Sequence, residues 1–239
     1  MIELIVEERV TFPSGPLRLA GVLAYPQEVT PERAVLVCSP HPHFAGDMNN
    51  NVVAAVTRHL AAHAVVLRFD YRGVGESQIA LGPEESAFDY WTDVEETKDY
   101  AGAVHDVRSA AQVLLDATRS WEIELSVIGY SFGAVTGMRF GRSDSRVHRM
   151  IAITPPLGRV SFDFLAGCPK PSLHLIGTRD FLYSQDKVEA FRTMLAPAGH
   201  VMVLDEADHF FRGDEDMLAQ EIEDFLQGTR NARGQRTTV

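Results

Sequence analysis

The sequence predicts an α/β fold in which a mostly parallel sheet is covered by helices on both faces. From about residue 33 onward, short runs rich in valine, leucine and isoleucine alternate with longer segments of helical periodicity. Most of these runs are apolar at every position, which is typical of parallel strands buried on both sides. The chain has 239 residues, 45% hydrophobic and 23% charged, an ordinary globular composition with enough apolar residues for one core.

The expected strands fall into two groups. Residues 8–12 and 17–25 flank Pro13-Ser14-Gly15-Pro16, which predicts an antiparallel hairpin at a sheet edge. The second group consists of six apolar runs, expected to be parallel strands: residues 33–39, 64–71, 125–130, 149–154, 172–177 and 200–205.

Helices are expected between these strands. Asn49, Asn50 and Asn51 offer N-cap side chains to a helix over 52–63. The other expected helices span 103–118, 132–141, 184–195 and 214–227, with Gly228 ending the last of them. We therefore predict a single domain over residues 1–228, followed by a flexible tail over 229–239.

The segment 76–102 is longer than the usual connection between a strand and a helix. It holds seven acidic residues between positions 84 and 99, together with the aromatic residues Phe88, Tyr90, Trp91 and Tyr100. Aromatic side chains that neither pack nor bind are unusual in a long exposed loop. We therefore expect a flap over a pocket rather than a solvated excursion.

The charge pattern restricts the partners of the protein. The formal net charge is −11, and the basic cluster of Arg230, Arg233 and Arg236 lies in the expected tail. Nucleic acids and anionic membranes are therefore not expected partners. The sequence contains no 18-residue apolar stretch and no export-signal pattern, and its two cysteines, Cys38 and Cys168, cannot form a disulfide framework. We expect a cytoplasmic monomer or homodimer.

The clearest chemical motif is Gly129-Tyr130-Ser131-Phe132-Gly133, where an apolar strand passes into a helix. A nucleophilic serine at such a turn takes a strained backbone that projects its hydroxyl into a cleft. Small residues two positions away on each side let strand and helix approach closely. The strand, turn and helix around the pentapeptide favour a functional Ser131 over a chance match.

A serine hydroxyl needs a base to take its proton and a carboxylate to orient that base. Asp180 and His209 each follow one of two consecutive predicted strands, at the edge where parallel sheets place ligands. The order Ser131, Asp180, His209 fits this strand arrangement. Taken alone, Asp180 could cap the next helix and His209 could be an ordinary loop histidine, and Asp205 and Asp208 are rival carboxylates.

An acyl-transfer site also needs donors for the developing oxyanion. The amide of Phe132 is one candidate. In the loop after the strand 33–39, Pro42 has no N–H, so His43 is the expected second donor and Phe44 the next choice. A zinc site at His41, His43 and Asp47 is the alternative for this loop, but no HExxH motif accompanies it and we expect no metal or other cofactor.

These motifs together resemble the α/β-hydrolase superfamily: GYSFG at 129–133, DYRGVGES at 70–77, GTRD at 177–180 and ADHFF at 207–211. The run PHPHFAGDMNNN at 40–51 resembles the small, lidless branch related to dienelactone hydrolases and short-chain esterases or peptidases. The resemblance implies an eight-stranded sheet whose second strand is antiparallel. It implies Ser131 as nucleophile, His209 as base and then acid, Asp180 as orienting carboxylate, and the amides of Phe132 and His43 as the oxyanion hole.

The expected function is hydrolysis of a carboxylic ester or thioester of a small molecule through an acyl-enzyme. An apolar pocket is expected to be lined by Phe44, Trp91, Phe132, Phe162, Leu182, Tyr183 and Phe210. Two alternatives remain open. One is a non-hydrolytic lyase or cyclase that uses the same residues, and the other is a binding protein that has lost its chemistry.

Overall fold

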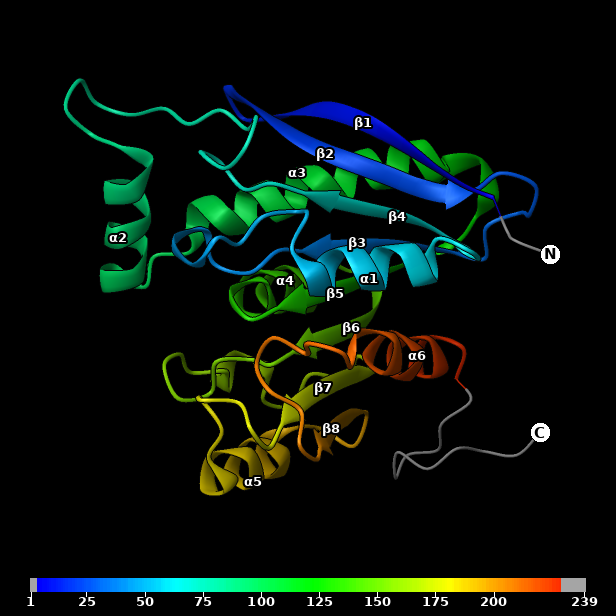
Figure 1. Cartoon of the computed structure of the whole chain (residues 1–239), viewed down its shortest axis with the longest axis vertical. Coiled ribbons are helices and arrows are strands. Elements are labelled where there is room, and N and C mark those ends of the chain that lie inside the picture. The colour runs from blue at the N-terminus through cyan, green and yellow to red at the C-terminus, as the bar shows by residue number, and fades with distance from the viewer. Residues whose placement is uncertain (1–3, 229–239) are drawn as a thin grey trace.

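A computed structural model describes residues 4–228; the predicted tail over 229–239 lies outside the described residues, as do residues 1–3. Its centre is an eight-stranded sheet in the order β1-β2-β4-β3-β5-β6-β7-β8 (Figure 1). The strand β2 (Leu17–Pro26) is antiparallel to both β1 (Ile5–Ser14) and β4 (Ala64–Phe69), and the remaining neighbouring strands are parallel. The parallel α/β fold and the antiparallel second strand are thus confirmed.

The other strands follow the predicted apolar runs closely: β3 (Arg33–Cys38), β5 (Glu124–Tyr130), β6 (Val147–Ile153), β7 (Ser172–Gly177) and β8 (Gly199–Leu204). Alternate side chains of β3 belong to different cores. Leu36 packs in the core on the side of α3 (Ala101–Thr118) and α4 (Phe132–Ser143). Val35 and Val37 pack with α1 (Asn51–Leu60) and α6 (Glu215–Leu226). Continuous apolarity therefore reflects burial on both faces.

The long segment 76–102 differs from the predicted loop because it contains a helix, α2 (Ala87–Thr97). The side chains of Ser86 and Asp89 form a capping box at its N-terminus. Trp91 and Val94, three residues apart, are buried in the core, so they hold one face of the helix against the domain. In Figure 1, α2 stands at the end of the sheet toward which β3 and β4 point.

A buried ion pair joins the loop after β4 to α3. The guanidinium of Arg72 donates from Nε to Asp106 Oδ2 at 2.9 Å and from Nη2 to Asp106 Oδ1 at 2.7 Å. Ser14 Oγ also donates to Oδ1 at 2.7 Å. The Asp106 side chain is fully buried, so these bonds replace the water that it loses on folding. They fix the start of the long segment against the domain.

Candidate active site

Ser131 lies at the sharp turn between β5 and α4. Its backbone has φ 54° and ψ −110°, a conformation that a residue with a side chain rarely adopts. A Cβ at Gly129 would lie 2.1 Å from the carbonyl oxygen of Gly133, and a Cβ at Gly133 would lie 2.1 Å from that of Cys38. Neither site can hold a side chain, which explains why glycines flank Ser131 at this spacing.

The structure brings Ser131, Asp180 and His209 into one hydrogen-bonded chain. Asp180 follows β7 and His209 follows β8, and both side chains are buried. His209 Nδ1 donates to Asp180 Oδ2 at 2.7 Å, and His209 Nε2 lies 3.2 Å from Ser131 Oγ, where it can accept the hydroxyl proton. Their convergence agrees with the sequence prediction, while their catalytic roles stay predictions.

Further bonds hold this arrangement in place. The amide of Leu182 donates to Asp180 Oδ1 at 2.8 Å, so both oxygens of the carboxylate are engaged. The hydroxyl of Tyr130 donates to the backbone carbonyl of His209 at 2.9 Å. These bonds restrict both the rotation of the Asp180 carboxylate and the position of the His209 backbone, so the imidazole reaches Ser131 without rearrangement.

The rival interpretations of the two downstream residues do not match the structure. The N-cap of α5 (Gln185–Met194) is Ser184, so Asp180 does not cap this helix. Asp205 accepts hydrogen bonds from Thr178 Oγ1 and the Glu206 amide, and Asp208 accepts one from the Phe210 amide. These bonds hold both rival carboxylates in their own turns.

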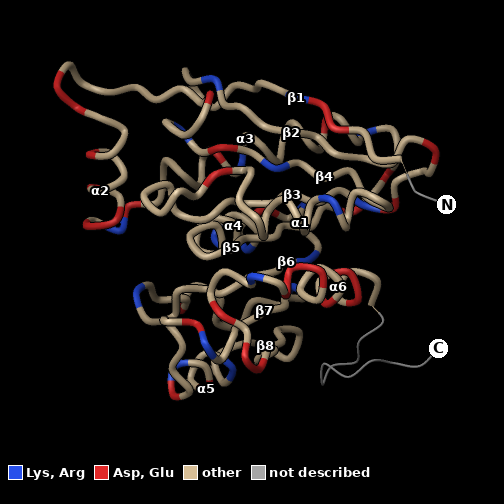
Figure 2. Tube along the Cα trace, in the orientation of Figure 1, with Lys and Arg blue, Asp and Glu red and all other residues tan. Residues whose placement is uncertain are grey.

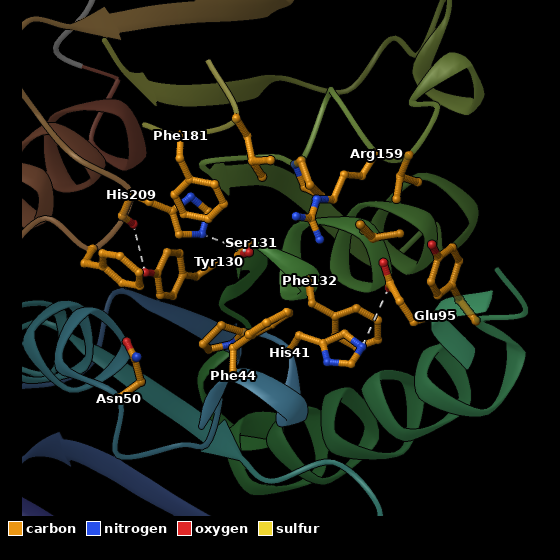
Figure 3. A pocket seen from close by; sticks show the side chains of 17 residues that line it. His41, Phe44, Asn50, Glu95, Tyr130, Ser131, Phe132, Arg159, Phe181 and His209 are labelled. Atoms are coloured by element: carbon orange, nitrogen blue, oxygen red, sulfur yellow. Dashed lines mark hydrogen bonds and ion pairs between the residues drawn. The ribbon is translucent and has the colours of Figure 1, made fainter. Parts of the chain in front are cut away.

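A cavity of about 160 Å³ opens at Ser131 and His209 (Figure 3). Most of its wall is apolar or aromatic, and Figure 3 shows the charged side chains of Glu95 and Arg159 on the side away from His209. The full lining comprises Pro40, His41, Phe44, Asn50, Glu95, Tyr100, Tyr130, Ser131, Phe132, Val135, Pro156, Arg159, Val160, Phe181, Leu182, His209 and Phe210.

The expected lining residues divide into two groups. Phe44, Phe132, Leu182 and Phe210 line the cavity, whereas Trp91, Phe162 and Tyr183 do not. Trp91 and Phe162 are 1% and 3% exposed and belong to the core, because their segments turn these rings inward under the site. Tyr183 lies two residues after the cavity residue Phe181. Its backbone N–H donates a hydrogen bond to the carbonyl of Asp180, which closes a turn and places Tyr183 beyond the cavity wall.

Sequence reasoning missed several lining residues. Phe181 directly follows Asp180, and its ring centroid lies 4.7 Å from that of His209. Its position next to the predicted acid was a signal that could have identified it. Glu95 comes from the unpredicted helix α2, and Arg159 comes from the irregular segment after β6, so neither had a pattern that pointed to the site.

The two expected oxyanion donors differ in their availability. Phe132 is the first residue of α4, so its N–H has no acceptor within the helix and lies at the positive end of the helix dipole. The N–H of His43 instead donates to Nδ1 of His41 at 3.1 Å, in a short 3₁₀ turn over Pro42–Phe44. An oxyanion would have to displace His41 as the acceptor of this amide.

His41 is a buried, neutral wall of the cavity. Burial lowers its pKa to about 4, although the nearby Glu95 carboxylate acts in the opposite direction. Because Nδ1 accepts the His43 amide, Nε2 carries the hydrogen, and it lies 3.8 Å from Glu95. Within residues 4–228, no three His, Cys, Asp or Glu side chains form a group able to hold a metal ion, so the zinc alternative lacks a ligand set.

Comparison with known proteins shows what the chain is similar to. No family model matches the chain. An uncharacterized protein of Rickettsia prowazekii is 31% identical over 212 residues, which cover 84% of this chain and 82% of that protein. A protein of unknown function from Agrobacterium tumefaciens, provisionally assigned to the α/β hydrolases, superposes with a TM-score of 0.74 at 27% identity over 93% and 95% of the two chains.

A serine hydrolase without a lid from Xanthomonas campestris superposes with the same TM-score of 0.74 at 23% identity, over 93% of this chain and 94% of that one. The similarity extends over nearly the whole sheet and its helices. Separately, no helix among the described residues is both long and apolar enough to cross a membrane. The chain therefore has the α/β-hydrolase fold and is similar to solved structures assigned to that superfamily.

Proposed function

We propose that the protein is a serine hydrolase that cleaves a carboxylic ester or thioester through an acyl-enzyme intermediate. The observation that carries this proposal is the hydrogen-bonded chain from Asp180 through His209 to Ser131 at the mouth of a mostly apolar cavity. The same three side-chain types, in the same relation, perform acyl transfer on several unrelated folds.

The first half of the reaction forms the acyl-enzyme. Ser131 Oγ attacks the acyl carbon as His209 Nε2 takes the hydroxyl proton, and Asp180 stabilises the imidazolium through Nδ1–H. The amide of Phe132 donates to the tetrahedral oxyanion, and we assign the second donor to His43, with its bond to His41 exchanged for one to the oxyanion. The proton then passes from Nε2 to the leaving oxygen or sulfur as the bond to the acyl carbon breaks.

Water completes the cycle. His209 takes a proton from a water molecule whose oxygen attacks the acyl carbon, and then returns that proton to Ser131 Oγ as the acid leaves. Every step uses groups of this chain and water. The lining residues Phe44, Val135 and Leu182 support an apolar acyl group as the part of the substrate inside the cavity.

The proposal is tested with a panel of p-nitrophenyl esters, acyl thioesters and aminoacyl amides, assayed with the wild type and with Ser131→Ala. We expect esters or thioesters to be turned over and Ser131→Ala to lose at least about 10³-fold in kcat while keeping its fold. Ser184→Ala is a matched control, because the Ser184 side chain makes no capping bond to α5. Equal turnover by wild type and Ser131→Ala would refute the assignment.

The same assay separates the alternatives. A hydrolase incorporates one oxygen from H₂¹⁸O into the released acid, whereas a lyase or cyclase that uses the same three residues does not. An inactive binding protein would turn over none of the panel. It would also leave Ser131 unmodified by a fluorophosphonate, which reacts with activated serine hydroxyls.

A further inference from the structure

A second cavity adjoins the active-site cavity. It measures about 480 Å³. Its wall consists of the residues just before α3, the first half of α3 and one residue of α4: Lys98, Asp99, Tyr100, Ala101, Val104, His105, Arg108 and Arg139. Tyr100 lines both cavities, so a ligand bound in one lies next to the other. The proposed reaction does not use any residue of this second cavity.

The cavity concentrates positive charge on an acidic protein. The chain has 22 Lys and Arg against 33 Asp and Glu, and Figure 2 shows acidic residues along both α2 and α6. Within residues 4–228, neither Arg108 nor Arg139 forms an ion pair with a carboxylate. Lys98 pairs with Glu95, and the carboxylate of Asp99 accepts the Ala101 amide. Two guanidinium groups therefore face this hollow without an acidic side-chain partner.

Two polar atoms at this site are buried without a hydrogen-bond partner: Tyr100 Oη and Arg139 Nε. Tyr100 is only 4% exposed, and burial raises its pKa to about 12, so its hydroxyl keeps its proton and can donate. The guanidinium of Arg139 lies over the Tyr100 ring, 5.3 Å from the centroid, and over the Phe164 ring at 4.4 Å. Buried donors are normally satisfied, so these two lack acceptors of the kind that a bound group could supply.

The remaining donors point to the same ligand. The cavity includes the first residue of α3, an 18-residue helix whose N-terminal amides carry partial positive charge. The wall of this cavity thus contains two guanidinium groups, a phenol and the start of a helix whose first amide is bound by Asp99. Arginine forks match the oxygens of a phosphate in geometry and charge.

We propose that this second cavity binds a phosphate group carried by the substrate whose ester or thioester bond reacts at Ser131. The inference rests on the proposed function for the reacting bond. The phosphate site itself rests on the unpaired arginines and the two unsatisfied donors. The resulting substrate class is a phosphorylated acyl ester or thioester, with its apolar acyl group beside Ser131 and its phosphate beyond Tyr100.

Two measurements test the proposal. The first compares kcat/KM for the butyryl thioesters of pantetheine and 4′-phosphopantetheine, which differ by one phosphate. We expect a preference of about tenfold or more for the phosphorylated thioester, reduced at least about fivefold in Arg108→Gln and Tyr100→Phe. Arg192→Gln is the matched control, because it removes an exposed arginine of α5 that pairs with Glu189, outside both cavities.

The second measurement does not depend on turnover. Calorimetric titration of Ser131→Ala with inorganic phosphate, at constant ionic strength, is expected to show binding that Arg108→Gln weakens and Arg192→Gln retains. Thermal unfolding confirms that each variant is folded. Equal kcat/KM for the two thioesters, or equal loss of binding in Arg108→Gln and Arg192→Gln, would overturn the proposal.

The two failures are distinguishable. Phosphate binding without hydrolysis of any ester or thioester would contradict the proposed function and leave the phosphate site in place. Hydrolysis with equal kcat/KM for both thioesters and no phosphate binding would contradict the phosphate site alone. Phosphate binding with equal kcat/KM would identify free phosphate as the ligand, and would overturn the assignment of the phosphate to the substrate.

Discussion

Replacing Asp180 by asparagine should change the tautomer of His209, so that the ring hydrogen lies on Nε2 instead of Nδ1. In the structure, the Leu182 amide donates to Asp180 Oδ1 and His209 Nδ1 donates to Oδ2. An asparagine would keep its carbonyl oxygen toward the Leu182 amide, which places its NH₂ against His209 Nδ1. Since Nδ1 must then accept, the hydrogen moves to Nε2, which can no longer take the proton of Ser131.

The cost follows from the loss of this base. Removing the correct tautomer in an acyl-transfer triad lowers kcat by about 10³ to 10⁴-fold. At 1.36 kcal/mol for each tenfold change, this is about 4 to 5 kcal/mol of transition-state stabilisation. The fold should lose only about 1 to 3 kcal/mol, because one charge-assisted hydrogen bond is replaced by a neutral one. The assay is kcat and kcat/KM on the best ester of the panel, with the free energy of unfolding measured in urea.

Asp208→Asn provides the matched control. Asp208 precedes His209 directly, and its oxygen accepts the Phe210 amide, which an asparagine carbonyl can also do. We expect Asp208→Asn to stay within about threefold of the wild type in kcat. The reasoning is refuted if Asp180→Asn keeps a tenth or more of wild-type kcat, or if Asp208→Asn loses as much as Asp180→Asn.

Three further predictions concern stability. Gly133→Ala should destabilise the protein by about 3 kcal/mol or more, or prevent folding, because its Cβ would lie 2.1 Å from a carbonyl oxygen of β3. In the control Gly158→Ala, the nearest atom to the new Cβ lies at 3.4 Å, so the free energy of unfolding in urea should stay within about 1 kcal/mol of the wild type. Arg72→Met leaves the Asp106 carboxylate buried and unpaired, so we expect a loss of about 3 to 5 kcal/mol, and an unchanged urea midpoint would contradict this. Burial lowers the pKa of His174 to about 3, so between about pH 6.5 and 3 the unfolded chain binds a proton that the folded chain does not. The free energy of unfolding should therefore decrease as the pH is lowered through this range, by up to about 1.4 kcal/mol per pH unit. His174→Gln should make this decrease smaller, and the same pH dependence in the variant and the wild type would exclude the assignment.

The sheet was predictable because its strands are buried on both faces. A run such as 33–39 shows no alternation, and the structure explains why: Leu36 packs into one core and Val35 and Val37 into the other. The position of Ser131 was predictable for a similar reason, since only glycine fits at 129 and 133. In both cases the tertiary constraint leaves a visible mark on the local sequence, an unbroken apolar run or a pair of glycines.

Helix α2 escaped prediction because its apolar face is narrow. Only Trp91 and Val94 are buried among eleven residues rich in acids, so the composition of 87–97 resembles a solvated segment more than a helix packed on the core. The signal that was present is the capping box, with Asp89 three residues after Ser86. The burial of Trp91 beneath the site depends on rings from other elements, including those of Tyr71 and Phe132, and no local pattern contains that information.

The availability of the His43 amide could not be deduced from residue types. The sequence favours His43 because Pro42 lacks an N–H, but residue types alone do not show which neighbouring side chain accepts the His43 amide. In the structure, the side chain of His41 caps the short turn and takes the His43 amide. The rings of Trp91 and Phe132 pack edge-on against His41 and hold it in this position, which is tertiary information.

Covalent trapping of the nucleophile tests the proposed catalytic role of Ser131 most directly. Wild type, Ser131→Ala and Asp180→Asn are treated with a fluorophosphonate, and the modified peptide is identified by mass spectrometry. We expect one phosphonyl adduct on Ser131 in the wild type, much slower labelling in Asp180→Asn, and no adduct in Ser131→Ala. An adduct on another residue, or labelling of Ser131→Ala at the wild-type rate, would contradict the claim that Ser131, His209 and Asp180 act as one catalytic unit.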